Sequence, residues 1–167
     1  MPVRDDAGQF VGVSDLRTIA IAAVTAATQG RTDRAEQALS LAEGVPDVQI
    51  GAARAVVDLV AGRGESAERI VRELAQSIDV FQTETAVNET GYVLMRNQQA
   101  ELALQLFEIN TRVFPDASNT WDSLGEAHMT LGNENEAIRA YEKSLELDPD
   151  NENARTMIAR IRGGGGF

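Results

Sequence analysis

Apolar and small side chains recur at three- and four-residue steps over two neighbouring stretches near the end of the chain. In the first stretch the recurring residues are Trp121, Leu124, Ala127, His128 and Leu131. In the second they are Ala137, Ile138, Tyr141, Ser144, Leu145 and Leu147. Residues three or four apart lie on one face of an α-helix. The pattern therefore predicts two helices that pack against each other through these faces.

The residues between and after these stretches are typical helix boundaries. Gly132 is a natural left-handed residue at a helix C-terminus, and Asn133 with Glu136 fits a capping box that starts the next helix. Pro149 ends the second helix. Gly125 lies inside the first helix, where glycine costs about 1 kcal/mol relative to alanine. That cost indicates a close crossing between the two helices.

The same arrangement recurs along the chain. Small residues equivalent to Ala137 are found at Ala35, Ala67 and Ala103, so that successive copies are 32, 36 and 34 residues apart. A period that persists while the residues vary is typical of a repeat array. We expect four helical hairpins, at about 16–47, 48–81, 84–117 and 118–151, with irregular turns near 44–47 and 77–83.

The flanking segments complete the predicted domain. The first helix starts at Ser14 or Asp15 and runs to Gln29, and the second is capped by Thr32 and ends near 44–46. Residues 152–162 form one more amphipathic helix, which covers the last hydrophobic face of the array. We expect a single domain over 14–162, a loosely ordered lead-in over 1–13 with a few extended residues within 9–13, and a flexible Gly-rich tail over 163–167.

Eight positions of the last hairpin resemble the consensus of the tetratricopeptide repeat (TPR): Trp121, Leu124, Gly125, Gly132, Ala137, Tyr141, Ser144 and Pro149. The resemblance implies an all-α fold, a right-handed α-solenoid of four TPR-like hairpins with a C-terminal capping helix. Residues 114–116 and 121–127 also resemble the TPR pairs that are fused to bacterial serine hydrolases. The likeness is strongest over the second half of the chain.

Composition narrows the function. The formal net charge of −11 argues against nucleic acid and anionic membranes as partners. The longest apolar run, residues 19–27, is too short to span a bilayer, and the acidic residues before it do not fit a signal peptide. We therefore predict a cytoplasmic protein. With no cysteine and only one histidine, His128, thiolate sites and multi-histidine metal sites are not available.

No catalytic motif stands out. The phosphate-loop, HExxH and GxSxG patterns are absent from the sequence. Asp122 and Glu126 lie one helical turn apart, as a general acid–base pair would. An acidic face in contact with solvent is the simpler interpretation, because nothing in the sequence buries the pair. We predict no enzyme, no cofactor, no metal and no catalytic residue.

The TPR resemblance implies that the first helix of each hairpin lines a concave groove. Its candidate partner-binding residues in the first two repeats are Ile21, Val24, Gln49, Val56 and Val60. In the last two they are Asn88, Glu89, Tyr92, Arg96, Asn119, Asp122 and Glu126. The first group is largely apolar and the second acidic. A matching partner segment would carry aliphatic anchors at one end and Arg or Lys at the other.

Three functions remain open at this point. The first is a protein–protein interaction scaffold that holds a partner peptide in the groove. The second is a regulatory or oligomerising appendage of an enzyme, for example a serine hydrolase. The third is a carrier of a small apolar ligand between the helices. The sequence leaves the identity of the partner and the oligomeric state open, self-association included.

Overall fold

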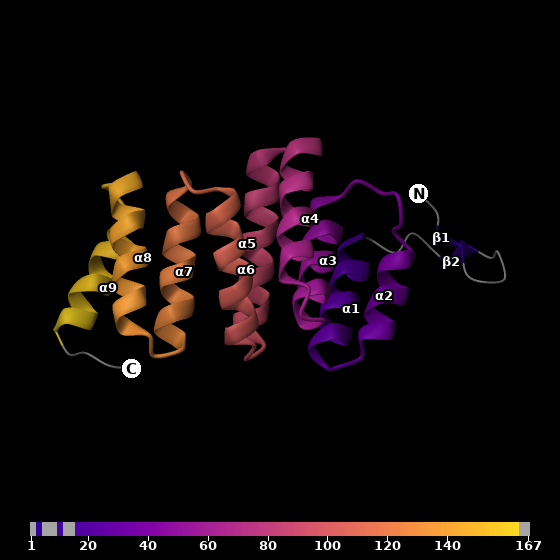
Figure 1. Ribbon diagram of the computed structural model, residues 1–167, viewed down its shortest axis with the longest axis horizontal. Coiled ribbons are helices and arrows are strands. Elements are labelled where there is room, and N and C mark those ends of the chain that lie inside the picture. Colours follow the sequence, from indigo (N-terminus) through magenta and orange to yellow (C-terminus); the bar gives the residue numbers. More distant parts are fainter. Residues whose placement is uncertain (1–2, 5–9, 12–15, 164–167) are drawn as a thin grey trace. The chain divides into compact units, whose positions relative to one another are not determined.

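The computed structural model describes residues 3–4, 10–11 and 16–163, and these residues are almost entirely helical (Figure 1). By their internal packing they divide into two compact units, residues 1–87 (unit 1) and residues 88–167 (unit 2). The expectation of a single domain over 14–162 stays a prediction.

Unit 1 holds two helical hairpins and the start of a third. They are formed by α1 (Leu16–Thr28), α2 (Thr32–Ser40), α3 (Val48–Val60) and α4 (Gly64–Ser77). The next helix, α5 (Val80–Arg96), passes from unit 1 into unit 2. Unit 2 continues with α6 (Ala100–Val113), α7 (Ser118–Thr130), α8 (Glu134–Leu147) and α9 (Glu152–Arg162).

The helices follow the predicted hairpin pattern, so the fold is all-α and of the α-solenoid class. Within unit 1, α1 packs against both α2 and α3, and α3 packs against α4. Within unit 2, α7 packs against both α6 and α8, and α9 packs against α8 (Figure 1). Each helix thus contacts helices one or two places away along the chain, as expected of a repeat array.

The turns inside the hairpins use left-handed residues, as predicted. Gly30, Gly62 and Gly132 have φ angles of 74°, 73° and 76°. In the third hairpin Gln98 takes the same place with a φ of 61°. A side chain with a Cβ atom is strained in this region, by roughly 1–2 kcal/mol. The repeat therefore keeps its turn geometry even where it lacks the glycine.

Several predicted helix ends need correction. Asp47 caps α3 as expected, since its side chain accepts hydrogen bonds from the backbone N–H groups of Gln49 and Ile50. Thr32 and Asn133 do not cap. Thr32 is already the first residue of α2, and Asn133 stands before α8 without a side-chain cap bond. Both helices follow glycine turns, in which backbone N–H groups bond to carbonyls at the end of the preceding helix.

Two helices also differ in length from the prediction. α2 ends at Ser40 rather than near 44–46. α5 starts at Val80, because Asp79 accepts a hydrogen bond from the Gln82 N–H at 2.8 Å and opens the helix there. The irregular turn expected over 77–83 is therefore short.

Three helical glycines mark close contacts within hairpins. A Cβ atom on Gly125 would lie 2.7 Å from the Tyr141 ring, and one on Gly91 would lie 2.3 Å from the Phe107 ring. A Cβ atom on Gly51 would lie 2.1 Å from a methyl carbon of Leu74. These separations are too short for a real side chain. The close crossing expected at Gly125 is thus present.

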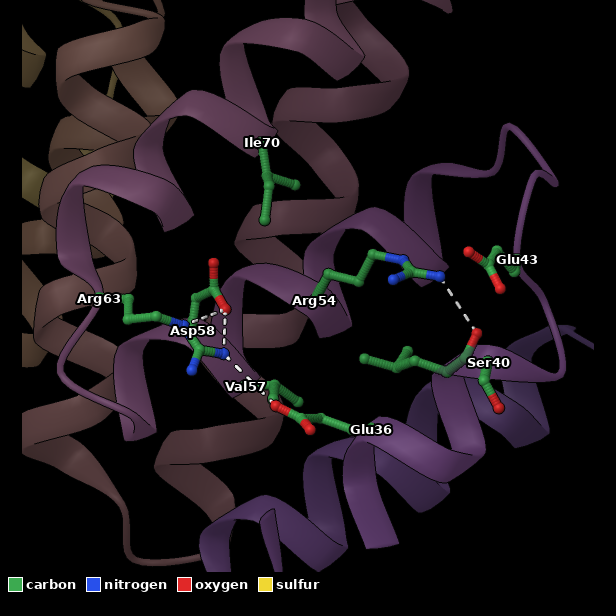
Figure 2. Close-up of a pocket in the computed structure, with 9 residues that line it drawn as sticks. Glu36, Ser40, Glu43, Arg54, Val57, Asp58, Arg63 and Ile70 are labelled. Atoms are coloured by element: carbon green, nitrogen blue, oxygen red, sulfur yellow. Dashed lines mark hydrogen bonds and ion pairs between the residues drawn. The ribbon is translucent and has the colours of Figure 1, made fainter. Parts of the chain in front are cut away.

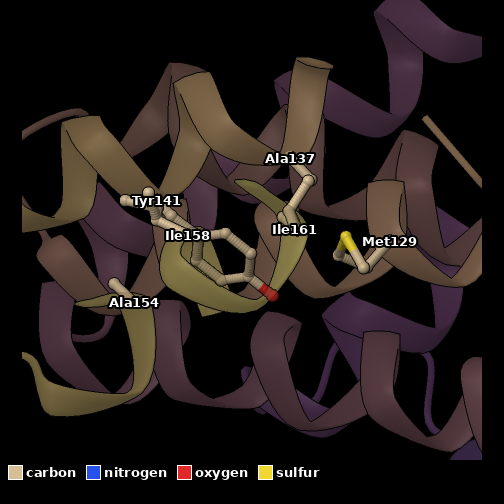
Figure 3. Close-up of a cluster of buried hydrophobic side chains, with 6 residues drawn as sticks. All are labelled: Met129, Ala137, Tyr141, Ala154, Ile158 and Ile161. Carbon is tan, nitrogen blue, oxygen red and sulfur yellow. The ribbon is translucent and has the colours of Figure 1, made fainter. Parts of the chain in front are cut away.

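The last helix closes the core of unit 2. Ala154, Ile158 and Ile161 of α9 pack against Tyr141 and Ala137 of α8 (Figure 3). The opposite face of α9 is exposed and carries charged residues. This arrangement confirms a capping helix over the predicted residues.

The ends of the chain are only partly described. Val3–Arg4 (β1) pairs with Phe10–Val11 (β2) as a short antiparallel ribbon. The extended residues expected within 9–13 therefore include a strand. The rest of the predicted lead-in, the helix start at Ser14 or Asp15 and residues 164–167 of the tail lie outside the described residues.

Candidate functional site

Two of the predicted groove residues, Tyr92 of α5 and Glu126 of α7, lie close together in unit 2. Tyr92 of α5 has its hydroxyl 3.1 Å from the Oγ atom of Ser123 on α7. The same Tyr92 side chain hydrogen bonds to Glu126, one turn further along α7. Either hydroxyl can donate in the bond between Tyr92 and Ser123.

The capping helix contributes two asparagines to the same place. Asp122 accepts a hydrogen bond from the Asn151 side chain at 2.9 Å and another from the Asn153 side chain at 2.8 Å. Asn153 also hydrogen bonds to Glu126. We call this set the unit 2 polar cluster: Tyr92, Asp122, Ser123, Glu126, Asn151 and Asn153. It spans α5, α7 and the start of α9.

Asn151 fixes the geometry of the cluster. Its side-chain oxygen accepts from the Ala154 N–H and so caps α9, while its amide nitrogen donates to Ser144 at 2.8 Å as well as to Asp122. One side chain therefore joins α7, α8 and α9. Asn151 and Asn153 are the members of the cluster that counting helix faces from the sequence did not identify, since both lie at a helix start.

The charge at Glu126 is poorly solvated. Burial raises the pKa of Glu126 above its usual range, and the negative charge of Asp122 raises it further, while the bonds from Tyr92 and Asn153 act in the opposite direction. Burial also raises the pKa of the Tyr92 hydroxyl. The cluster thus holds two half-buried carboxylates side by side.

A buried hydroxyl lies behind the cluster. The Tyr141 side chain is fully buried, and in the described part of the chain its hydroxyl has no hydrogen-bond partner. Burial raises the pKa of Tyr141, and the charges of Glu126 and Asp122 add to this effect. The hydroxyl is therefore close enough for the negative charges of both carboxylates to raise its pKa. It leaves a polar group on the inner side of the cluster with unused hydrogen-bonding capacity.

The other predicted residues of unit 2 differ in accessibility. Glu89, Arg96 and Asn119 are exposed. Asn88 is 8% exposed, and its side-chain oxygen has no partner among the described residues. It stands one turn before Tyr92 on α5. Glu89 and Arg96 thus remain available at the surface, whereas Asn88 is a buried polar residue.

The predicted apolar anchors of unit 1 need correction. Val24 and Val56 are 7% and 0% exposed, so they belong to the core of the unit rather than to a contact surface. Gln49 and Val60 are half-buried, and Ile21 is 53% exposed. Of the apolar residues predicted there, Ile21 and Val60 are the ones a partner can reach.

Unit 1 contains a pocket that the sequence analysis did not find. It has a volume of about 350 Å³ and lies among α2, α3 and α4 (Figure 2). Leu39, Val57 and Ile70 supply its apolar lining. The polar residues that line it are Glu36, Ser40, Glu43, Arg54, Asp58 and Arg63. They come from three consecutive helices and the turns beside them, and only the packing of these helices brings their side chains together, which no pattern within one helix reveals.

Other site types have no support within the described residues. No helix among them is long and apolar enough to cross a membrane. Across residues 3–4, 10–11 and 16–163, no group of three or more Asp, Glu or His residues is placed to hold a metal ion.

Comparison with known proteins supports the resemblance to the tetratricopeptide repeat family. Residues 118–151 match the tetratricopeptide repeat family model. The chain is 27% identical over 116 residues to the "Superkiller complex protein 3" of Mus musculus, a match that covers 70% of this chain and 7% of the relative. It is 34% identical over 87 residues to the "Hsp70-Hsp90 organizing protein" of Triticum aestivum, which covers 47% of this chain and 15% of the relative. The chain therefore spans only a small part of these curated relatives.

Solved structures with the same fold include those of MamA. A point mutant of MamA superimposes with a TM-score of 0.52 at 21% identity, covering 72% of this chain and 88% of that chain. "Crystal structure of MamA" gives a TM-score of 0.51 at 17% identity, covering 93% and 87%. At these identities the likeness concerns the fold, and it agrees with the helical-repeat architecture described above. The predicted likeness to serine-hydrolase fusions stays a prediction.

Proposed function

We propose that this protein is a protein–protein interaction scaffold, and that unit 2 binds a basic segment of its partner at the unit 2 polar cluster. The observation that carries the proposal is Glu126. Its carboxylate is half-buried beside a second carboxylate, in surroundings that disfavour its charge. Perturbed carboxylates of this kind gather at functional sites more often than elsewhere.

The chemistry of the cluster favours a cation. Asp122 has Asn151 and Asn153 as donors, whereas Glu126 takes hydrogen bonds from Tyr92 and Asn153 and receives no ion pair within the described residues. A guanidinium or ammonium group would compensate the charge of both carboxylates at once. The exposed Glu89 on α5 adds negative charge on the same helix as Tyr92. No catalytic step is needed to account for this arrangement.

Accessible aliphatic residues in unit 1 are candidates for further contacts with the partner. Ile21 and Val60 replace the buried Val24 and Val56 as candidates for packing against aliphatic side chains of the partner. Burying one such side chain contributes roughly 1.5–3 kcal/mol. An exposed ion pair contributes about 0–1 kcal/mol. The basic group therefore sets orientation and association rate, and apolar contacts supply most of the affinity.

The test uses a defined probe. A short fluorescein-labelled peptide that alternates leucine and arginine is titrated with the full chain, and its anisotropy is followed. Glu126→Gln should weaken binding about tenfold, since a charge-assisted hydrogen bond to a partly buried group is lost. Binding of the unchanged protein should weaken in high salt. The same peptide with glutamate in place of arginine should not bind.

Glu134→Gln is the matched control. Glu134 is exposed on α8 and lies outside the cluster. Glu134→Gln therefore changes the net charge of the protein by the same amount as Glu126→Gln. It should leave the affinity unchanged. Equal weakening by Glu134→Gln and Glu126→Gln would mean that the peptide responds only to net charge, and the proposal would then be wrong.

A further inference from the structure

The pocket of unit 1 contains a cation, Arg54, that forms no ion pair with any described residue. Arg54 of α3 is half-buried, and its guanidinium donates one hydrogen bond, from Nη2 to the backbone oxygen of Leu39 at 3.1 Å. Among the described residues it forms no ion pair with a carboxylate. A half-buried charge without a counter-ion is costly to maintain.

The other arginine of the pocket, Arg63, forms ion pairs with carboxylates. Arg63 contacts Asp58 at 2.6 Å and Glu36 at 3.6 Å, so two carboxylates already balance it. Hydrogen bonding to Asp58 is the main reason why the pKa of Arg63 is raised. Figure 2 shows this ion-pair group at one end of the pocket and Arg54 with Glu43 at the other.

Glu43 supplies an anion at the Arg54 end. It is exposed, and its carboxylate has no hydrogen bond or ion pair within the described part of the chain. Glu43 lines the same pocket as Arg54, and the two form no ion pair in the described structure. The Arg54 end of the pocket therefore presents one positive and one negative group without ion pairs, and Leu39, Val57 and Ile70 line the same pocket, with Val57 and Ile70 nearer to its Arg63 end in Figure 2.

From this arrangement we infer that the pocket binds a free α-amino acid with a branched aliphatic side chain. The carboxylate would lie against Arg54 and the ammonium group against Glu43, with the side chain on Leu39, Val57 and Ile70. A volume of about 350 Å³ falls at the small end of ligand pockets. A phosphate is disfavoured, because a dianion would meet Glu36, Glu43 and Asp58 with only one unbalanced cation to receive it.

This site is distinct from the proposed function. It lies wholly in unit 1, on residues that the peptide proposal does not use. The two proposals can therefore fail independently, and a small ligand in unit 1 would add a second binding activity to the scaffold.

The test is a titration of the ¹⁵N-labelled full chain with three probes, followed by the chemical shifts of backbone amides in α2, α3 and α4. L-leucine carries both charges, 4-methylpentanoate lacks the ammonium group, and 3-methylbutylamine lacks the carboxylate. We expect L-leucine to bind most tightly, by about tenfold over either analogue, since each lost charge contact is worth on the order of 1 kcal/mol. Equal affinities for the three probes, or no shifts at all, would overturn the inference.

Two substitutions give opposite signatures. Arg54→Gln should weaken both L-leucine and 4-methylpentanoate about tenfold. Glu43→Gln should weaken L-leucine but strengthen 4-methylpentanoate, because it removes a negative charge that repels the lone carboxylate. A change of the same sign for both probes in Glu43→Gln would contradict the assigned ammonium position.

Structural side effects are separated by two further variants. Arg54→Lys keeps the charge and should bind L-leucine within a few-fold of the unchanged protein, whereas a purely packing role for Arg54 would make it as weak as Arg54→Gln. Arg34→Gln removes an exposed arginine of α2 outside the pocket and should leave binding unchanged.

An acetylated tetrapeptide ending in leucine distinguishes binding of a free amino acid from binding of a peptide C-terminus. If the tetrapeptide binds as tightly as L-leucine, the pocket binds a peptide end and the proposal of a free amino acid is wrong.

Discussion

At the scale of single residues, Glu126 links stability to the proposed function. Its pKa is raised in the folded protein, so the folded state holds the proton more tightly than the unfolded chain. The contribution to stability is therefore present at low pH and is lost as the pH rises from the ordinary value of 4.5 through the raised pKa. Above that range the ionised Glu126 stabilises the fold less than its protonated form does.

We accordingly predict that Glu126→Gln stabilises the protein at neutral pH. The amide keeps an acceptor for the Tyr92 hydroxyl but carries no charge beside Asp122. The melting temperature should rise by about 1–2 °C at pH 7 and match that of the unchanged protein at pH 4. Thermal unfolding followed by circular dichroism at both pH values measures this. An increase of the same size at pH 4 would show that the charge is not the cause.

Sequence reasoning located the polar cluster better than its apolar counterpart. Tyr92, Asp122 and Glu126 were predicted to share a face, and the structure brings them together. Val24 and Val56 were placed on the equivalent face of unit 1 but are buried. Helical periodicity identifies the side of a helix on which a residue lies. It does not distinguish a small apolar residue that lines a surface from one that packs beneath it.

At the scale of secondary structure elements, the attachment of α9 depends on Asn151. Its side chain caps the helix and also bonds to Ser144 and Asp122. Asn151→Ala should lower the free energy of unfolding by about 1–2 kcal/mol, since loss of a cap alone costs about 1 kcal/mol and the buried Ser144 loses a partner. Urea denaturation gives this value directly.

Asn153→Ala is the comparison variant for the same helix. Asn153 is exposed and bonds to the carboxylates of Asp122 and Glu126 without capping α9. Its loss should cost less than about 0.5 kcal/mol. Equal losses in the two variants would mean that the link between α7 and α9, rather than the cap, holds the capping helix in place.

Helix existence was predictable for every element from α1 to α9, because each carries its own apolar face and most end at a glycine or proline. The ends were less predictable. Thr32 and Asn133 are good capping residues in isolation, yet Thr32 already lies inside α2 and Asn133 makes no side-chain cap bond; the left-handed turns at Gly30 and Gly132 bond to carbonyls of the preceding helices. The pocket of unit 1 could not be predicted, since its shape depends on how the side chains of three helices pack.

At the scale of the whole molecule, the fold is a series of contacts between near neighbours. The spacing of 32, 36 and 34 residues between the equivalent alanines predicted the hairpins, because the two helices of each repeat pack in the same way. Each unit has its own buried residues, and the helix pairs that pack within it join elements one or two places apart. In such arrays each repeat is stabilised by its own contacts and by those with adjacent repeats, so a substitution that destabilises one repeat affects its neighbours first.

We therefore predict that glycine substitutions act within their own unit. Gly51→Ala places a Cβ atom against Leu74 in unit 1, and Gly125→Ala places one against the Tyr141 ring in unit 2. Overpacking of this kind costs about 1–3 kcal/mol. The leucine tip can rotate away more easily than the enclosed ring, so Gly125→Ala should be the more destabilising of the two.

Native-state hydrogen exchange locates each effect. Gly51→Ala should speed exchange in α3 and α4 and leave α7 and α8 unchanged, while Gly125→Ala should do the reverse. Gly64→Ala provides a control, because no atom lies within 4 Å of the added Cβ and exchange should not increase in either unit. Faster exchange throughout the chain in both Gly51→Ala and Gly125→Ala would show instead that residues 14–162 unfold as one cooperative domain, since a local disturbance would then be transmitted along the continuous helix α5 to every repeat.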